Sequence, residues 1–488
     1  MAAIEATAQQ SRKAKSSPIS SFVFETYQRP EHEVRLRRNS DQRSYEANRI
    51  LRNFMGMSLL FSVNHGCVVA CLSLASARLG TTGNMQSGIL YMSYTGSALL
   101  GATYTVKKLG PRDSLVAGLA LYCVYVAAFW MASSFPFFAK PVSFLGALVG
   151  GVGAGLLWTA QGAFFGMAAE CHALALAQET SLSTSKLAGI FAFMYLGLEL
   201  LLRSMSSALL KLFSVAWSTI FGIYALLAIL SAVGMMFVQQ PEDVSVNGED
   251  DSQVQSVWWK ITVALQLLRK DPKMRYMIGL NAVFGFASAF LNSYVNSEVV
   301  RVVLHDSQTR YIGLLSAWMS AVAATMSLAL GRIPNKGIVL TLGSVCFLGV
   351  AAPFLVSNFS LGGWNMIGVV VVYTLHGVGR ATFEGTLKAS FADLFSQEKE
   401  GAFANIILQN GLASAIGFFI STMSCTPEQR HCIQFQDGSH HDVGILAWMV
   451  VITAFFAIYG YWRADRLFRQ QSSSFPSVWT LVENESVI

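Results

Sequence analysis

Three charged residues follow one another at intervals of four within an otherwise apolar stretch, residues 362–393. They are Arg380, Glu384 and Lys388, and on a helix this spacing places them on one stripe. Charges within a membrane helix are costly, so they usually face a bundle interior or a watery cavity. The stripe is either a solute site, with Arg380 holding an anionic group and Glu384 exchanging a proton, or a structural ion pair. In both interpretations we expect Lys388 near the membrane surface.

A second pair of opposite charges, Glu199 and Arg203, has the same four-residue spacing in another apolar stretch. We expect it to be an intramembrane ion pair with a structural role, because each charge neutralises the other on one helix face. His65 lies in a third apolar stretch. An imidazole there either titrates near neutral pH or packs between helices with its hydrogen bonds satisfied.

The composition is that of a membrane protein. Of the 488 residues, 53% are hydrophobic and only 13% are charged, whereas a typical soluble domain has about 25% charged residues. Twelve apolar spans have about 20 residues each, the length that a helix needs to cross a bilayer. The spans are 53–77, 85–106, 113–134, 142–169, 187–211, 214–238, 276–300, 309–330, 336–357, 364–393, 401–424 and 442–463.

The spans form two groups of six around a polar connector. We expect a basic, largely disordered tail over 1–52, six-helix bundles over 53–238 and 276–466, a linker with an amphipathic helix over 239–275, and a tail over 467–488. Short basic turns with a proline, at 107–113 and 331–336, occupy corresponding places in the two groups. Two six-helix pseudo-repeats in parallel are typical of the major facilitator fold. The predicted fold class is therefore an all-α membrane protein with twelve transmembrane helices.

The distribution of basic residues predicts that both termini of this multi-pass protein lie in the cytosol. Most of the 34 Lys and Arg residues lie in the loops and tails on the side of the termini, as the positive-inside rule requires. On the opposite side, Asn358 begins an Asn-Phe-Ser triplet that is a candidate for glycosylation, and Cys425 and Cys432 are candidates for a disulfide. A chance triplet and two free thiols are the alternatives. Neither feature distinguishes the plasma membrane from an internal membrane.

Five short motifs follow one another in the first half of the chain. They are Leu-Gly-Thr-Thr-Gly at 79–83, Ser-Gly-Ile-Leu-Tyr-Met-Ser-Tyr-Thr at 87–95, Lys-Lys-Leu-Gly-Pro-Arg at 107–112, Gly-Ala-Gly-Leu-Leu-Trp-Thr-Ala-Gln-Gly at 153–162 and Ala-Glu-Cys-His at 169–172. Their order resembles the UNC-93-like branch of the major facilitator superfamily. The second half resembles this family more loosely, through His-Gly-Val-Gly-Arg at 376–380 and a segment at 402–411. Arg380 departs from the family pattern, which usually has an acid at this place.

The resemblance implies a membrane protein that, in several members, is an accessory factor associated with potassium-channel regulation, receptor trafficking or, in plants, ion homeostasis. We expect a secondary transporter that moves a small solute or ion by alternating access. The alternative is a non-transporting regulatory subunit of a potassium channel, or a trafficking partner of other membrane proteins. The expected partners are the lipid bilayer, an unidentified solute or ion and, under the alternative, an ion channel or receptor.

The resemblance also implies that the first helix of each three-helix unit lines a central cavity. Polar residues are frequent in these four spans, so we expect a substrate or ion pathway along them. Its candidate residues are Asn64, His65, Trp158, Gln161, Asn281, Asn292, Arg380 and Glu384. Three amides of the eleventh span, Asn405, Gln409 and Asn410, are expected to form hydrogen bonds between helices.

Several function classes are not expected. The sequence has no Walker A loop and no nucleophile elbow, so neither an ATP-driven pump nor another enzyme is predicted. The seven cysteines have no Cys-x-x-Cys spacing, so no metal site and no cofactor are predicted. Apart from its basic N-terminal tail, nothing in the sequence indicates nucleic-acid binding.

Overall fold

The computed structural model describes residues 20–240, 257–395, 399–435 and 437–474. Among them, eleven helical segments are long and apolar enough to cross a membrane, and each corresponds to one predicted span. The predicted span at 85–106 is the exception. It corresponds to helices α2 (Thr81–Leu100) and α3 (Ala102–Leu109), and α2 is less apolar because it contains Asn84, Gln86 and several hydroxyl side chains. These amides are buried, because α2 packs between α5 and α15 inside the bundle.

The first half of the chain contains helices α1 to α7. Beyond α2 and α3 they are α1 (Ser20–Leu79), α4 (Pro111–Ser134), α5 (Ala139–Leu176), α6 (Thr180–Phe213) and α7 (Trp217–Met235), with a 3-10 turn, η1 (Pro136–Phe138), before α5. Helix α1 begins well before its apolar part. Residues 20–52 are therefore helical, whereas the sequence predicts a largely disordered tail there. Residues 1–19 lie outside the described part of the chain.

The second half contains the other six spans. They are formed by α9 (Pro272–Phe290) with η2 (Leu291–Val299) and α10 (Val300–Val303), by α11 (Ile312–Leu330), by α12 (Lys336–Val356), by α13 (Met366–Ala381) with η3 (Thr382–Leu387) and α14 (Lys388–Leu394), by α15 (Lys399–Ile420) and by α16 (Gly444–Ser474). The linker contributes α8 (Val257–Lys270), which packs on α15. Asn405 on α15 donates a hydrogen bond of 2.9 Å to the carbonyl of Ala264 in α8. The predicted linker helix is thus present, and one of the predicted amides holds it.

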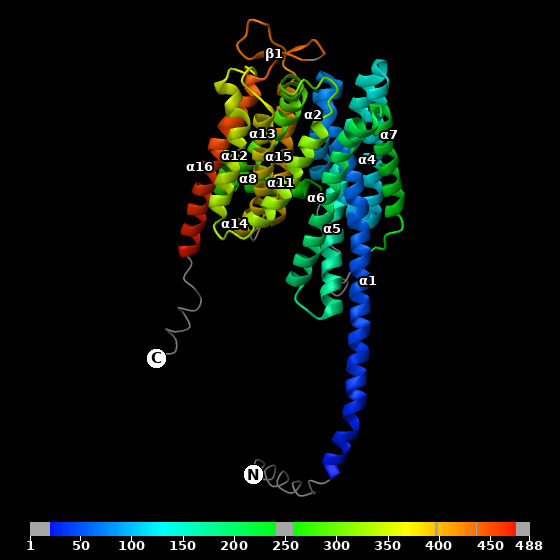
Figure 1. The fold of residues 1–488 in the computed structure, drawn as a ribbon. Helices are drawn as coiled ribbons and strands as arrows, with labels where there is room; N and C mark the ends of the chain where they lie inside the picture. Colours follow the sequence, from blue (N-terminus) through cyan, green and yellow to red (C-terminus); the bar gives the residue numbers. More distant parts are fainter. Residues whose placement is uncertain (1–19, 241–256, 396–398, 436, 475–488) are drawn as a thin grey trace.

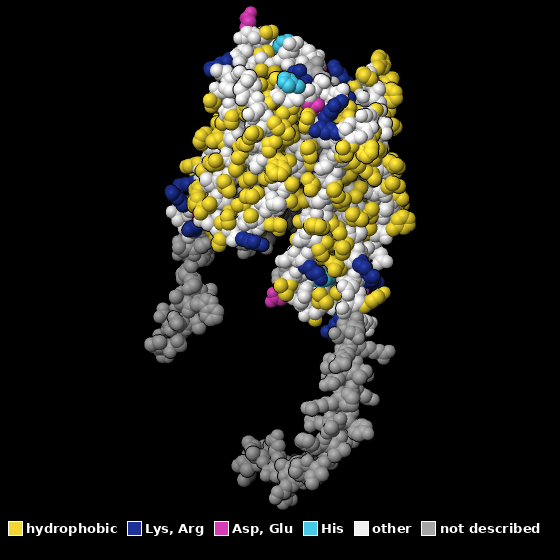
Figure 2. Space-filling view, viewed as in Figure 1, with side chains coloured by type: hydrophobic (Ala, Val, Ile, Leu, Met, Phe, Trp, Pro, Cys, Tyr) yellow, Lys and Arg dark blue, Asp and Glu magenta, His cyan; other side chains and the backbone are white. Residues whose placement is uncertain are grey.

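The helices stand side by side, with the start of α1 and the end of α16 at one end of the molecule (Figure 1). The opposite end carries a short hairpin of β1 (Cys432–Gln434) and β2 (His440–Asp442). We call these ends the terminal side and the hairpin side. Apolar side chains cover most of the visible surface between them, and the surface is hollowed between the two halves on the terminal side (Figure 2). The halves therefore lie apart on the terminal side.

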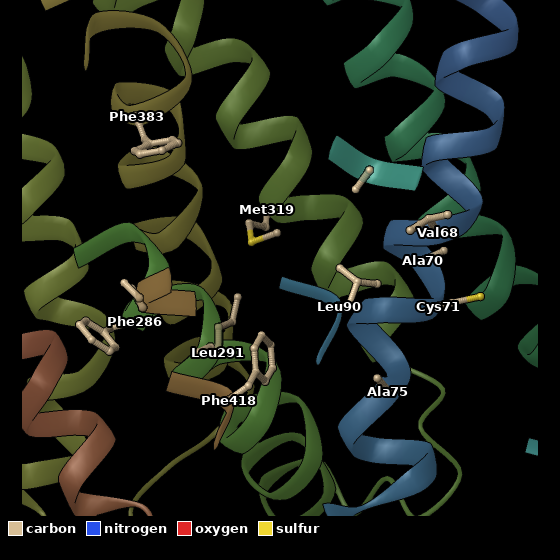
Figure 3. Close-up of a cluster of buried hydrophobic side chains, with 14 of the residues drawn as sticks. Val68, Ala70, Cys71, Ala75, Leu90, Phe286, Leu291, Met319, Phe383 and Phe418 are labelled. Carbon is tan, nitrogen blue, oxygen red and sulfur yellow. The ribbon is translucent and has the colours of Figure 1, made fainter. Parts of the chain in front are cut away.

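On the hairpin side the two halves are in contact. Asn296 in η2 donates a hydrogen bond of 2.7 Å to the carbonyl of Ser73 in α1. Lys211 at the end of α6 lies 3.7 Å from the centre of the Tyr311 ring. Helices α2 and α15 of the two halves also pack together, and they carry the buried apolar residues Leu90 and Phe418 (Figure 3). The shape is that of two bundles joined on one side and separated on the other.

The hairpin itself reaches from the second half to the first. Asp437 accepts hydrogen bonds from the backbone N–H and the hydroxyl of Thr81, at 2.9 and 2.8 Å, and Thr81 begins α2. Ser439 and His441 also lie within hydrogen-bond distance of the Thr81 hydroxyl. A disulfide joins Cys425 to Cys432 at the base of the hairpin, with their Cα atoms 5.8 Å apart. We call the contact of Thr81 with Asp437, Ser439 and His441 the hairpin latch.

Acid is expected to weaken the hairpin latch. Partial burial raises the pKa of Asp437, but hydrogen bonds from Ser439 and Thr81 outweigh this effect and lower the pKa from 3.8 to about 2. Because the folded-state pKa is the lower one, the stabilisation is fully present above pH 4 and is lost as the pH falls through about 2. The melting temperatures of the wild type and Asp437→Asn, measured from pH 6 to pH 2.5, should therefore converge towards low pH. A constant difference would contradict the role of the carboxylate.

A close approach of α6 and α11 across the halves requires a glycine. A Cβ atom on Gly313 would lie 2.5 Å from the carbonyl oxygen of Arg203 and would also collide with the Ser206 hydroxyl. We expect Gly313→Ala to lower the free energy of unfolding by about 1–3 kcal/mol, because a backbone atom cannot move aside as a side chain does. Gly189→Ala on α6 is the control, since no atom lies within 4 Å of its added Cβ. Equal melting temperatures for the two variants would refute the close packing.

Candidate functional site

Five charged side chains form a chain of ion pairs between the two halves, with Glu199 and Arg380 about midway along their spans and Lys388 nearer the terminal side. Glu199 and Arg203 come from α6 of the first half, and Arg380, Glu384 and Lys388 come from α13, η3 and α14 of the second. We call them the charge cluster. The two stretches that the sequence singles out separately therefore form one site.

Glu199 is the centre of the charge cluster. Its carboxylate is fully buried and accepts two hydrogen bonds from the Arg380 guanidinium, at 2.6 and 2.9 Å. Arg203 lies 3.0 Å from the same carboxylate, and the Ser320 hydroxyl of α11 donates to it at 2.9 Å. Forked arginine–carboxylate pairs of this kind are among the stronger polar contacts in proteins. Here the pair ties the two halves together inside the membrane.

The predicted pairing of Arg380 with Glu384 is present as a longer ion pair, but Glu199 is the closer partner of Arg380. The shortest distance between these two side chains is 3.7 Å, between Nε of Arg380 and Oε1 of Glu384. Lys388 instead donates to Glu384 at 3.0 Å, and both side chains are partly exposed. The helix changes to π geometry at Thr382, between Arg380 and Glu384. A π-helix has more residues per turn than an α-helix, and both i,i+4 contacts of the predicted stripe, Arg380–Glu384 and Glu384–Lys388, are nevertheless present.

The described part of the second half has two π-helical segments, and each carries a polar group next to a contact between the halves. η3 contains Glu384, and η2 contains Asn296. Asn296 contacts α1 through Ser73 and accepts a hydrogen bond from Tyr373 of α13. π-helical turns are rare and are often found at functional sites, because they redirect side chains. The two segments lie in the spans predicted to line the cavity.

An aromatic group of the first half lies beside the charge cluster. His65 shares a hydrogen bond of 3.1 Å with the Tyr195 hydroxyl, and Tyr195 precedes Glu199 by one turn of α6. The Trp158 ring centre lies 5.3 Å from that of His65. Gln161 follows Trp158 on α5 and is half-buried. Three predicted pathway residues, His65, Trp158 and Gln161, thus belong to helices around one region of the first half.

The three predicted asparagines form other hydrogen bonds. Asn64 is fully buried and donates to the carbonyl of Ala228 at 2.9 Å, so it joins α1 to α7 within the first half. Asn281 donates to Gln409 at 2.7 Å and joins α9 to α15 within the second half. Asn292 donates to a carbonyl of its own helix at 2.8 Å. Buried amides often form hydrogen bonds between packed helices, which accounts for Asn64 and Asn281, and the place of the three asparagines in a pathway stays a prediction.

Three residues of the site were not predicted from the sequence. Ser320 is one of four hydroxyl residues in its apolar span, with Ser316, Thr325 and Ser327, and nothing in the sequence distinguishes it from the others. Tyr195 does carry a signal, since it lies four residues before Glu199 and therefore on the same helix face. Asn296 carries a similar signal in the sequence, because it lies four residues after Asn292.

The structure also places the glycosylation candidate of the hairpin side, the triplet that begins at Asn358. Asn358 is exposed in the turn after α12 and accepts a hydrogen bond of 3.1 Å from Arg430. The serine of its triplet, Ser360, is exposed as well. Among the described residues, no group of three or more His, Cys, Asp or Glu side chains is arranged to hold a metal ion.

Comparisons with known proteins identify relatives and folds. The family model described as "Ion channel regulatory protein UNC-93" matches residues 80–359. UNC93-like protein 3 of Arabidopsis thaliana is 25% identical over 355 residues, which cover 70% of this chain and 73% of the plant protein. Protein unc-93 homolog A of Bos taurus is 27% identical over 213 residues. That match covers 42% of this chain and less than half of the bovine protein, 45%.

Two solved structures show the fold. The nucleoside transporter NupG, as its D323A mutant, has a TM-score of 0.60 and 11% identity, and the match covers 85% of this chain and 99% of the transporter. A D-xylose-proton symporter has a TM-score of 0.56 and 15% identity, with 84% and 96% covered. Both have the major facilitator fold. The fold class predicted from the sequence is thereby confirmed, and so is the resemblance to the UNC-93-like group.

Proposed function

Because this chain belongs to the UNC-93 family and has the major facilitator fold, we propose that it moves a small solute or ion across a membrane by alternating access. In this mechanism two bundles rock about a central site, so that the site opens to one side of the membrane at a time. The proposal requires contacts between the halves that differ between the two sides. It also requires polar groups in the middle of the membrane.

One observation carries the proposal, the forked pair between Arg380 and Glu199. It joins the halves at mid-membrane, with the hairpin latch on one side of it and the hollowed surface on the other (Figure 2). Buried charges that served packing alone could pair within one helix, as Arg203 does with Glu199. A pair across the interface instead places polar chemistry where a transporter moves.

We propose that the terminal side faces the cytosol, because most basic residues of the loops and tails lie on that side. The hairpin side would then face an oxidising compartment, which suits the disulfide and a sugar on Asn358. In this orientation the described state is open to the cytosol. The moving bodies are the six-helix halves at 53–238 and 276–466.

We further propose that the pathway passes the half-buried residues beside the charge cluster. Trp158 and Gln161 line its first-half wall, with His65 behind them. Glu384 and Lys388 line the second-half wall, where 37% and 44% of their side-chain surfaces are exposed. A solute entering from the terminal side meets these groups before it reaches Arg380.

Reconstitution into vesicles tests transport directly. The purified chain should take up at least one solute from a panel of halides, carboxylates, alkali cations, sugars and nucleosides, at a rate above that of empty vesicles. Arg380→Lys should reduce this uptake, because lysine keeps the charge but loses the fork that binds both carboxylate oxygens. Lys336→Gln, which alters an ion pair outside the charge cluster, should leave uptake unchanged. If wild-type vesicles take up nothing from the panel, the transport proposal fails.

A second candidate function is regulation of an ion channel without transport. The observation that favours it is the description of the family as an ion channel regulatory protein. Under this function, uptake is absent, and a channel copurifies with the chain whether or not Arg380 is replaced by lysine. Affinity purification of both variants, beside the uptake assay, therefore separates the two functions.

A further inference from the structure

We propose that the charge cluster binds a small monovalent anion, either a halide or a carboxylate. The inference rests on the proposed transport function only in taking this anion to be the solute that is carried. The binding itself follows from the charges, their partners and their exposure.

The charge cluster is not electrically balanced. Arg203, Arg380 and Lys388 are cations, whereas only Glu199 and Glu384 are carboxylates. An arginine side chain does not lose its proton in proteins, so the excess positive charge cannot be removed at the buried end of the cluster. An uncompensated charge away from water is costly. A bound anion removes this cost.

The buried end of the cluster has donors left over. Glu199 is already surrounded by Arg380, Arg203 and Ser320, so it cannot satisfy further N–H groups. Among the described residues, Nε of Arg203 is buried and has no hydrogen-bond partner. Nδ1 of His65 is likewise buried without a partner. Each of these two nitrogens is available to donate a hydrogen bond to a bound anion, beside an excess of positive charge.

The other end of the cluster gives access. Arg380 is nearly buried, but Glu384 and Lys388 are 37% and 44% exposed. They follow Arg380 towards the terminal side, where the halves lie apart (Figure 2). An anion that comes from the terminal side thus meets Lys388 and Glu384 before the buried arginines.

Single substitutions can either raise or lower the net charge of the charge cluster. Glu384→Gln removes a carboxylate and raises the net charge of the cluster from one to two. Lys388→Gln removes a cation and lowers the net charge to zero. The two side chains are neighbours on one helix and are similarly exposed, so general damage to the fold would affect both variants alike. Lys336→Gln removes a cation paired with Asp393 outside the cluster and is the matched control.

The experiment measures anion binding by the full-length chain in detergent or nanodiscs. Gluconate is replaced stepwise by chloride, and in a second series by acetate, at constant ionic strength, and the melting temperature is recorded. We expect a saturable rise with at least one of the two anions and no rise when sodium replaces potassium. Glu384→Gln should lower the apparent Kd about tenfold and Lys388→Gln should raise it about tenfold. Each substitution changes the charge beside the bound anion by one unit. Lys336→Gln should match the wild type.

Two results would overturn the inference. One is the absence of any saturable anion effect in the wild type and in Glu384→Gln. The other is the reverse order of the variants, with tighter binding after Lys388→Gln. The uptake assay separates this failure from failure of the proposed function. Vesicles that carry a cation or a neutral solute without anion binding leave transport standing and refute the anion site. Anion binding without any uptake supports the site and refutes transport.

Discussion

Glu199→Gln is expected to lower the free energy of unfolding by about 3–5 kcal/mol, the cost of breaking a buried ion pair. The neutral amide accepts one hydrogen bond at its oxygen, but it leaves the guanidinium groups of Arg380 and Arg203 without a counter-charge. Both lie around a carboxylate that has no exposed surface. The expected result is a strongly lowered melting temperature and poor delivery to the membrane.

Glu384→Gln is the matched control, since it makes the same chemical change in the same cluster. The Glu384 side chain is 37% exposed and its partner Lys388 is 44% exposed, and ion pairs near water contribute only about 0–1 kcal/mol. Thermal unfolding of both variants in one detergent gives the comparison. If the two variants lose equal stability, Glu199 is not the centre of the cluster.

Loss of the disulfide is expected to have the second largest effect, confined to the hairpin side. Cys425 and Cys432 are seven positions apart in the sequence, and closing so short a loop stabilises a fold by about 2–3 kcal/mol. In Cys425→Ser/Cys432→Ser, the hairpin should loosen and Asp437 should release Thr81. Hydrogen exchange of the amides of β1 and β2 should then become faster, while exchange within α9 stays slow.

A reductant provides the control for this prediction. It should accelerate exchange in the wild-type hairpin but have no further effect on the double variant. Gly80 offers a second route to the same opening, because its φ is +56° and an added Cβ would collide with the Asp437 carboxylate. Gly80→Ala should therefore also release the latch. Unchanged exchange in the double variant would show that the disulfide does not hold the hairpin.

The fold could be predicted from the sequence because it depends on long apolar spans, and those spans are continuous. The bilayer requires about 20 apolar residues per helix, and eleven of twelve predicted spans satisfied this criterion in the structure. The second span is more polar because α2 is shielded by α5 and α15. Its Asn84 and Gln86 are buried against protein rather than lipid.

The candidate site was only partly predictable. The sequence identified all five charged residues, since a charge in an apolar span is conspicuous. It assigned their partners by spacing along one helix, and that rule cannot reveal that Arg380 reaches Glu199 on another helix, 181 residues away. Nor does the spacing reveal the π-helical turn at Thr382. The asparagines present a related difficulty, because an Asn that joins two packed helices, as Asn64 and Asn281 do, looks the same in sequence as one that lines a pathway.

Opposite movement of the halves on the two sides of the membrane is the most direct test of alternating access about the Arg380–Glu199 pair. Spin labels on exposed positions measure the distance between the halves on each side. The hairpin-side pair is Leu212→Cys with Val302→Cys, and the terminal-side pair is Leu174→Cys with Ile333→Cys. Pulsed electron resonance would give both distances in the wild-type background and after Asp437→Ala. We predict that release of the latch lengthens the hairpin-side distance and shortens the terminal-side distance together. Two distances that stay fixed, or that change in the same direction, would contradict the mechanism.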